Sequence, residues 1–188
     1  MKYDADDAQF SEWVACAQQG DPAGFDSLVR ALERPLAGFV RARGAADPEG
    51  LVNEVLVRVF SGIAGFDGNA PQFRAWVFRI ARNLLVDERR RDGRRPHVVA
   101  TAPDMLPEPI FSQPAFSEPT PDRLDESERV EAILAQVTSE QREVLLLRVV
   151  AELSVEETAE VLDCRPGAVR ALQHRGLKRL RQEFARKP

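Results

Sequence analysis

The chain has 188 residues, with 26 lysines and arginines against 30 aspartates and glutamates and a formal net charge of −4. This length allows one domain or two small ones with real cores, and an acidic balance at first argues against a nucleic-acid ligand. No apolar run approaches the roughly 18 residues of a membrane-spanning helix, and the acidic start (Asp4, Asp6, Asp7) excludes a typical secretory signal. Cys16 and Cys164 lack metal-binding spacing, as is typical of reduced thiols. We therefore expect a cytoplasmic protein without membrane insertion.

The positive charge is concentrated in two segments. Residues 73–95 hold eight arginines against three acids, or +5, and residues 165–188 hold eight basic residues against Glu183, or +7. When these two segments are subtracted from the total of −4, the remaining residues carry −16. Two basic segments about seventy residues apart are typical of a protein that contacts one polyanion at two places.

The sequence before residue 73 predicts three helices and a loop. Asp21-Pro22 and Asp47-Pro48 are each typical of an N-cap followed by a proline at the first helical position. Glycines at 62, 65 and 68 then interrupt the helical pattern, so residues 65–71 predict a loop. The segments with apolar residues at helical spacing are residues 7–19, residues 22–40 with Pro35 inside, and residues 48–60.

Residues 73–95 predict the helix around which this part of the chain is organised. Phe73, Val77, Ile80 and Leu84 recur at the spacing of one buried helix face, and Trp76 borders that face. Dense arginine beside aromatic side chains suits a phosphate backbone and unstacked bases. An amphipathic helix with a solvated basic face is the alternative explanation. One flank of the same helix carries Arg79, Asn83, Asp87 and Arg90.

Residues 96–121 differ in composition from the segments on either side. Seven of these 26 residues are proline and none is lysine or arginine. This composition predicts an acidic, Pro-rich linker in a partly extended conformation. Its apolar residues either pack on a domain or dock into a partner: Met105, Leu106, Ile110, Phe111 and Phe116.

Residues 122–188 predict a second helical domain. Capping boxes at 138–141 and 154–157 precede predicted helices over 142–150 and 155–162. A tight turn follows, and Pro166 begins a last helix with one apolar and one basic face. A short helix, a turn and a basic helix form the order of a helix-turn-helix, whose second helix enters a major groove. A helical hairpin with a solvated basic face is the alternative.

Several motifs, in one order along the chain, resemble the extracytoplasmic-function (ECF) branch of bacterial sigma factors. Residues 73–84 (Phe-Arg-Ala-Trp-Val-Phe-Arg-Ile-Ala-Arg-Asn-Leu) are similar to the promoter-melting and minus-ten segment of this family, and residues 49–60 are similar to its polymerase-binding helix. Residues 141–148 and 153–180 resemble its second domain with the minus-thirty-five reader. The resemblance implies an all-α fold: a region 2-like bundle over 1–95, the Pro-rich acidic linker over 96–121, and a region 4-like helix-turn-helix domain over 122–188.

The resemblance also implies partners and site residues. The partners are core RNA polymerase, through its β′ clamp helices and β flap, promoter DNA and an anti-sigma factor. A loop over 66–72 would capture a flipped base, as base extrusion requires a pocket with polar edges; for the neighbouring Asn83 the alternative is a hydrogen-bonding role in the core. The residues expected at the minus-ten element are Phe66, Asn69, Arg74, Trp76, Arg79, Arg82, Asn83 and Arg90. Those expected at the minus-thirty-five element are Arg165, Arg170, Ala171, His174, Arg175 and Lys178. Those expected to bind core polymerase are Leu51, Asn53, Glu54, Val57 and Arg58.

The alternative function is a free-standing helix-turn-helix regulator that acts without polymerase, although such a protein needs neither helix 51–60 nor the basic stretch 73–95. Catalysis is not expected, because only His97 and His174 are present and no phosphate loop or nucleophile constellation is found. No cofactor, metal or small-molecule substrate is expected either. The chain departs from the family at Gly50, where an aspartate is usual, and at residues 171–173, so promoter preference cannot be transferred.

Overall fold

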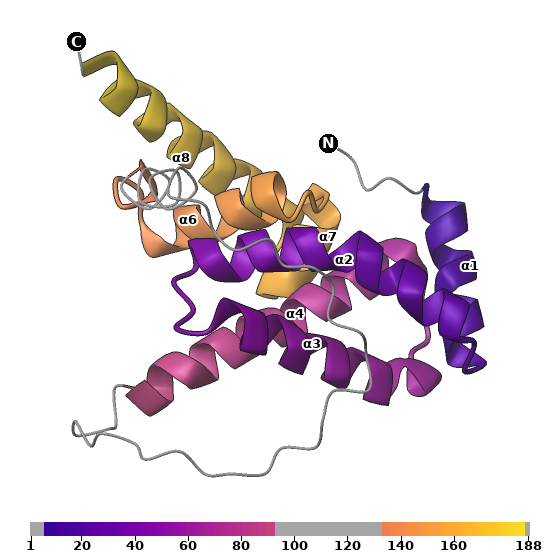
Figure 1. Cartoon of the computed structure of the whole chain (residues 1–188). Helices are drawn as coiled ribbons and strands as arrows, with labels where there is room; N and C mark the ends of the chain where they lie inside the picture. Colours follow the sequence, from indigo (N-terminus) through magenta and orange to yellow (C-terminus); the bar gives the residue numbers. More distant parts are fainter. Residues whose placement is uncertain (1–5, 93–132, 187–188) are drawn as a thin grey trace, which may run out of the picture.

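A computed structural model describes residues 6–92 and 133–186 of the chain, which we call the first block and the second block. Within these ranges the chain forms helices and turns and no strand, so the predicted all-α fold is confirmed (Figure 1). The predicted linker, residues 96–121, lies outside the described residues, as do parts of both predicted domains. No helix of the two blocks combines the length and apolar character needed to cross a bilayer.

The first block consists of four α-helices and one short 3₁₀ turn. The predicted caps are confirmed, because the side chains of Asp21 and Asp47 accept hydrogen bonds from Ala23 N and Gly50 N. Residues 70–71, predicted to be loop, belong instead to a helix: Asn69 and Gln72 exchange reciprocal side-chain hydrogen bonds of 2.9 and 3.0 Å that close its first turn. The elements are α1 Asp7–Gln18, α2 Pro22–Ala42, α3 Pro48–Gly62, η1 Ile63–Gly65 and α4 Ala70–Asp92.

The second block contains the predicted helix-turn-helix order. Both capping boxes are formed, at Thr138 and at Ser154. The predicted helix over 142–150 is helical throughout, but its type changes: the α-helix ends at Leu145 and a π-helical turn follows, in which the amide of Ala151 donates to the carbonyl of Leu146 at 2.9 Å. The elements are α6 Ser139–Leu145, η2 Leu146–Val150, α7 Val155–Leu162 and α8 Pro166–Arg186.

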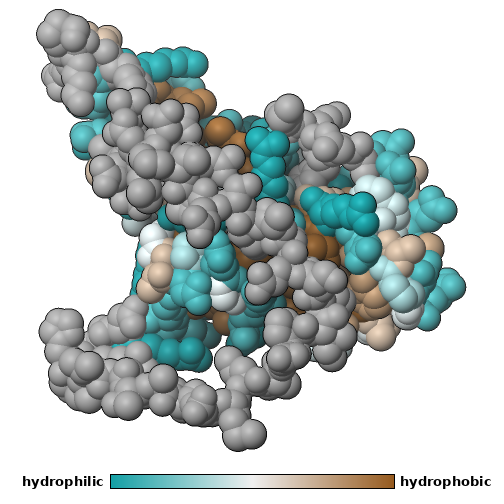
Figure 2. All heavy atoms as spheres, viewed as in Figure 1, coloured by the Kyte–Doolittle hydropathy of each residue, from teal (hydrophilic) through white to brown (hydrophobic). Residues whose placement is uncertain are grey.

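The two blocks pack against each other and share one apolar core. Helix α7 contacts α4, and η2 contacts α2, so the second block lies over the first in Figure 1 while the C-terminal half of α8 extends away. On the face drawn in Figure 2, apolar residues lie mostly toward the centre and hydrophilic residues toward the rim. The second block contributes to the shared cluster Leu134, Leu146, Leu147, Ala151, Leu153 and Val161. A smaller cluster of Val144, Ala159 and Val169 lies within the second block.

Candidate nucleic-acid and polymerase interfaces

A pocket of about 290 Å³ lies where η1, the following loop and α4 meet. The ring of Phe66 stacks on Trp76 at 5.3 Å between centroids, and Gln18 holds the loop by donating to the carbonyls of Ile63 and Phe66. Aromatic faces beside amide and guanidinium groups can stack on a base and hydrogen-bond its edge. The lining residues are Gly62, Gly65, Phe66, Asp67, Gln72, Trp76, Arg79 and Glu160.

One side of α4 continues from this pocket as an exposed polar strip. Arg79, Asn83 and Arg90 are exposed, and their steps of four and seven residues place them on one side of the helix. Asn83 is therefore not a core residue, which excludes the alternative stated for it above. Asn69 is exposed as well, and its side chain caps the first turn of the helix. The structure thus brings five of the predicted minus-ten residues to the pocket and the strip: Phe66, Trp76, Arg79, Asn83 and Arg90.

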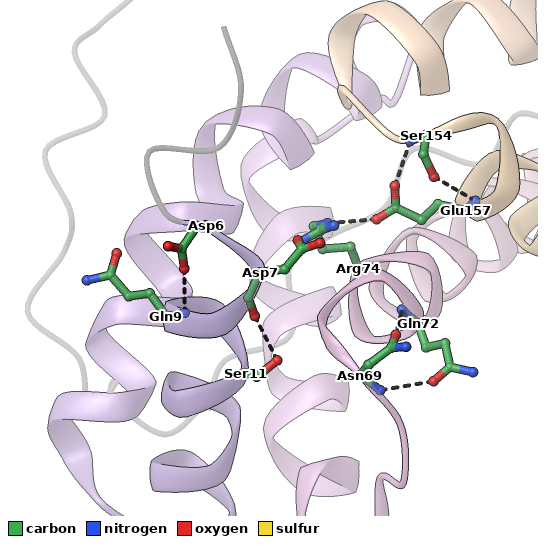
Figure 3. A network of polar contacts seen from close by, with 9 residues as sticks. All are labelled: Asp6, Asp7, Gln9, Ser11, Asn69, Gln72, Arg74, Ser154 and Glu157. Carbon is green, nitrogen blue, oxygen red and sulfur yellow. Dashed lines mark hydrogen bonds and ion pairs between the residues drawn. The ribbon is translucent and has the colours of Figure 1, made fainter.

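Arg74, predicted to be a minus-ten contact, is instead buried between the two blocks and only 7% exposed. Its Nε donates to Oε1 of Glu157 at 2.7 Å and its Nη1 donates to Oδ1 of Asp7 at 2.9 Å, so one guanidinium links α1, α4 and α7 (Figure 3). The guanidinium also lies over the ring of Phe10. Burial alone would lower the pKa of Arg74, but Glu157 and Asp7 raise it above its ordinary value. Arg74 is therefore unavailable to DNA in this arrangement.

A second charged cluster joins the blocks near the middle of α4. Arg82 donates to Oε1 of Glu143 at 3.0 Å, and Arg43 lies 3.4 Å from the same oxygen. Burial lowers the pKa of Arg43; Glu143 opposes this, and the like charges of Arg89, Arg82 and Arg142 lower it further. Sequence reasoning did not identify Arg43 or Glu143, because no local pattern marks a pair that is joined only by tertiary packing.

The exposed side of α3 carries most of the predicted polymerase contacts. Asn53, Glu54, Val57 and Arg58 are exposed, and Val57 is one of two large apolar residues of the described chain that are mostly exposed, at 60%. Leu51 was predicted to belong to this surface, but it is buried in the core.

Gly50, which replaces the usual aspartate, lies beside the capping residue of α3. A Cβ at this position would lie 2.2 Å from a carboxylate oxygen of Asp47, and that carboxylate accepts a hydrogen bond from the amide of Gly50. A side chain here would therefore displace the cap.

Helix α8 presents its basic face to solvent. Val169, on the opposite face, is fully buried, and Gly176 packs closely on Leu145. Arg170 forms an exposed ion pair with Glu156 of α7 at 3.0 Å. All the predicted minus-thirty-five residues are exposed: Arg165, Arg170, Ala171, His174, Arg175 and Lys178. Among the described residues, no group of three or more His, Cys, Asp or Glu side chains could hold a metal ion.

Two sigma-70 family models match the chain, in the order that the motifs predicted. Sigma-70 region 2 matches residues 28–95 and sigma-70 region 4 matches residues 127–180. The first match includes α3, the pocket loop and α4, and the second includes α6 to most of α8.

Similar proteins and structures agree with these matches. The chain is 31% identical over 178 residues to the ECF RNA polymerase sigma factor SigD of Mycobacterium tuberculosis, covering 91% of this chain and 82% of SigD. It is 36% identical over 136 residues to the ECF RNA polymerase sigma factor ShbA of Streptomyces griseus, covering 71% and 69%. CnrH, solved in complex with the cytosolic domain of CnrY, has the same fold, with a TM-score of 0.69 at 24% identity over 95% of this chain and 99% of that one. The chain therefore belongs to the ECF sigma factors of the sigma-70 family.

Proposed function

We propose that this protein binds core RNA polymerase and directs it to promoters by contacting DNA at two elements. The observation that carries this proposal is that three exposed surfaces lie on three different helices, in the family's order. They are the α3 strip (Asn53, Glu54, Val57 and Arg58), the pocket with the α4 strip, and the basic face of α8. A free-standing regulator needs only the last of these, so polymerase-dependent initiation accounts for more of the molecule.

The first block would open and hold the minus-ten element. A base rotated out of the duplex would enter the pocket and stack near Phe66 and Trp76, while Arg79 and Gln72 contact its polar edge. Unstacking a base costs a few kcal/mol, which stacking on aromatic rings, at about 1–3 kcal/mol per base, can offset. Asn83 and Arg90 would contact the following nucleotides along the strip. No covalent chemistry is required of the protein.

The second block would contact the minus-thirty-five element through α8. The helix can lie in a major groove with Arg170 and Arg175 toward base edges and Lys178 toward a phosphate, since arginine is the commonest partner of guanine edges. Ala171 is exposed between them and offers an apolar contact, for example to a thymine methyl group. The combination of Arg170, Ala171 and Arg175 implies that this protein prefers a different promoter sequence from relatives with other residues at these positions.

An anti-sigma factor is a further partner that we infer from related structures. The sigma factor RpoE of Bartonella quintana was solved in complex with the anti-sigma factor NepR and shares the fold, with a TM-score of 0.59 at 19% identity over 87% of this chain. A partner of this kind would bind where it blocks the polymerase or DNA surfaces. Because the proposed work is done on polymerase and promoter DNA, we expect the protein to act in the cytoplasm.

The direct test is transcription in vitro by core polymerase with and without the purified protein, followed by mapping of the transcript starts. We expect new starts that depend on the protein. Permanganate footprinting of one such promoter then tests the first block. Replacement of Asn83 by alanine should leave polymerase binding unchanged but reduce strand opening, whereas replacement of Arg91, which is also exposed but lies beyond the strip, should have little effect. If core polymerase neither binds the protein nor changes its starts, the proposed function is wrong.

A further inference from the structure

Helix α1 precedes the residues that match sigma-70 region 2, yet it lies against the pocket loop (residues 63–69). The match begins at residue 28, whereas α1 covers Asp7–Gln18 and contacts η1, the first part of this loop. No residue of α1 is among those that line the pocket. An influence of α1 on the pocket must therefore pass through the loop that it contacts.

Gln18, the last residue of α1, hydrogen-bonds to the pocket loop at two points. Its Nε2 donates to the carbonyl of Ile63 at 3.1 Å and to the carbonyl of Phe66 at 2.7 Å. Because both partners are acceptors, each takes one of the two N–H groups of the amide. The backbone amide of Phe66 also donates to the carbonyl of Ile63 at 3.0 Å. A single side chain thus holds the 3₁₀ turn and the residue that follows it.

The packing of α1 gives Gln18 a fixed position. Phe10, Val14 and Ala17 of this helix are buried. A Cβ on Gly24 of α2 would lie 2.7 Å from the backbone nitrogen of Ala17, so α1 and α2 are in close backbone contact. A side chain carried by a packed helix holds its partners more precisely than one carried by a loop. Gln18 therefore anchors the loop rather than following its movements.

Phe66 and Trp76 together form the aromatic part of the pocket wall. The two rings stack at 5.3 Å between centroids, and the ring of Phe66 meets that of Phe73 edge-on at 5.1 Å. Aromatic pairs are favourable over centroid distances of about 4.5–7 Å, so ring contacts alone leave the backbone of Phe66 free to shift. The neighbouring Gly65 adds little restraint, since even a Cβ there would meet no atom within 4 Å. The hydrogen bond from Gln18 supplies this restraint.

The other end of the loop is held by α4. The reciprocal hydrogen bonds between Asn69 and Gln72 fix Asn69 on the first turn of this helix. Only Asp67 and Gly68 lie between this fixed point and Phe66. With both ends held, little conformational entropy is lost when a base enters the pocket. Without the Gln18 anchor, only one end of the loop would be held.

The anchor also fixes the direction of a peptide group in the pocket wall. The carbonyl and the N–H of a trans peptide point in opposite directions, and the described residues contain no cis peptide. Because the carbonyl of Phe66 faces Gln18, the N–H of Asp67 faces away from α1. Phe66 and Asp67 both line the pocket, so Gln18 determines how this part of the wall is turned without lining the pocket itself.

We propose that Gln18 is a positioning residue for base capture, which holds the pocket loop in the form that receives the flipped base of the minus-ten element. Gln18 does not contact DNA; it acts through Phe66 and the peptide group that follows it. This inference rests on the proposed function. It adds that strand opening depends on α1, which lies outside the matching region 2, and specifically on the ability of residue 18 to donate hydrogen bonds.

Two substitutions of Gln18 separate hydrogen-bond donation from packing. An ionised glutamate has the shape of glutamine but only acceptors, whereas lysine has three donors and no acceptor. Gln18→Glu therefore places a carboxylate against two carbonyls, and Gln18→Lys restores donation to both. The matched controls are Gln19→Glu and Gln19→Lys, because Gln19 is the exposed next residue and the charge changes are the same. The full-length proteins are compared with core polymerase on one mapped promoter, by permanganate footprinting and by polymerase affinity.

We expect Gln18→Glu to reduce strand opening at least about tenfold relative to Gln19→Glu, because two hydrogen bonds are lost. Its affinity for core polymerase should stay within about twofold of the control, and Gln18→Lys should open the promoter as well as Gln19→Lys does. A merely structural defect would lower opening and polymerase affinity together, so that result overturns the inference. Equal opening by Gln18→Glu and Gln19→Glu, or an equal loss in Gln18→Glu and Gln18→Lys, overturns it as well.

Fluorescence of Trp76 gives an independent measurement that needs no polymerase. Trp13→Phe leaves Trp76 as the single tryptophan of the chain, and acrylamide is a neutral quencher, so its access does not depend on the charge of residue 18. Because Gln18 holds Phe66 on Trp76, Gln18→Glu should raise the Stern–Volmer constant above the values for Gln18→Lys and Gln19→Glu in the same background. An unchanged constant would show that the loop keeps its place without the anchor, which overturns the inference.

Failure of the inference and failure of the proposed function give different results. If core polymerase opens no promoter with the parent protein, the proposed function is contradicted. If the parent opens its promoter and Gln18→Glu opens it equally well, only the role of Gln18 is contradicted.

Discussion

Arg74 illustrates how the environment of one side chain decides its role. It lies within the residues that match sigma-70 region 2, yet its guanidinium is buried against Glu157 and Asp7. Both partners, on α7 and α1, are distant in sequence. The raised pKa of Arg74 keeps its guanidinium charged at physiological pH.

Replacement of Arg74 by methionine should destabilise the protein strongly. The change leaves the buried carboxylate of Glu157 without its cation, and breaking a buried pair in this way costs about 3–5 kcal/mol. The measurement is the free energy of unfolding in urea. Adding Glu157→Gln should recover part of the stability, because an amide is cheaper to bury than an unpaired carboxylate.

The matched control is Arg30→Met. Arg30 pairs with Asp26 on the surface, where both side chains are more than 60% exposed, and exposed pairs contribute little. We expect a change of less than about 0.5 kcal/mol. An equally small effect of Arg74→Met would show that the buried pair does not hold the blocks together.

The sequence predicted the helices better than it predicted other features of the structure. The N-caps, both capping boxes, the bounds of the helix over 155–162 and the start of the last helix at Pro166 follow from local hydrogen-bonding rules. The π-helical turn over 146–150 did not follow from them, because it depends on burying Leu146 and Leu147 against the first block.

The sequence predicted only part of the candidate site. Exposure of the basic face of α8 and of the α4 strip followed from periodicity, whereas the burial of Leu51 and Arg74 did not. Burial of Arg74 depends on a partner 83 positions away. Such contacts have no signature in a single sequence.

A substitution at Val57 of α3, with a similarly exposed valine as its control, tests the proposed polymerase surface. Val57→Asp should weaken binding to core polymerase at least tenfold, because a charge at the centre of an apolar contact costs well over 1 kcal/mol. Val149→Asp, at a residue exposed to 62% in the second block, should have a much smaller effect. Affinity for immobilised core polymerase measures both. A similar decrease for both variants would argue against α3 as the main polymerase surface.

Helix α8 gives a prediction on salt dependence. Replacing Arg170, Arg175 and Lys178 by alanine should weaken binding to a mapped upstream element and reduce its log–log salt slope by up to about 2.7, or about 0.9 for each phosphate that is no longer neutralised. The control replaces three arginines of α2 that lie away from this face: Arg30, Arg34 and Arg41. Anisotropy titrations at several salt concentrations measure the slope. An unchanged slope for the α8 variant would exclude this face as the DNA surface.

At the scale of the whole molecule, the shared core predicts that the two blocks unfold together. Both tryptophans of the chain, Trp13 and Trp76, lie in the first block, so their fluorescence reports mainly on that block. Leu147 is in the second block and fully buried in the shared cluster. Leu147→Ala should therefore lower the urea midpoint seen by tryptophan fluorescence, with a destabilisation of about 2–5 kcal/mol.

Val144→Ala is a second test of joint unfolding. Val144 belongs to the smaller cluster within the second block, so with joint unfolding its replacement should shift the midpoints seen by circular dichroism and by tryptophan fluorescence equally. Should Leu147→Ala leave the fluorescence transition in place, the blocks are thermodynamically independent and the packing between them is weak.

The shared apolar cluster also predicts how the two blocks behave when they are produced as separate polypeptides. A fragment ending at residue 92 exposes the surface that Leu147, Leu153 and Val161 cover, and a fragment beginning at residue 133 exposes those leucines and that valine to water. Each fragment alone should be prone to aggregation, whereas co-expression should yield a soluble non-covalent heterodimer. Split-protein complementation would then measure the affinity of the two halves for each other.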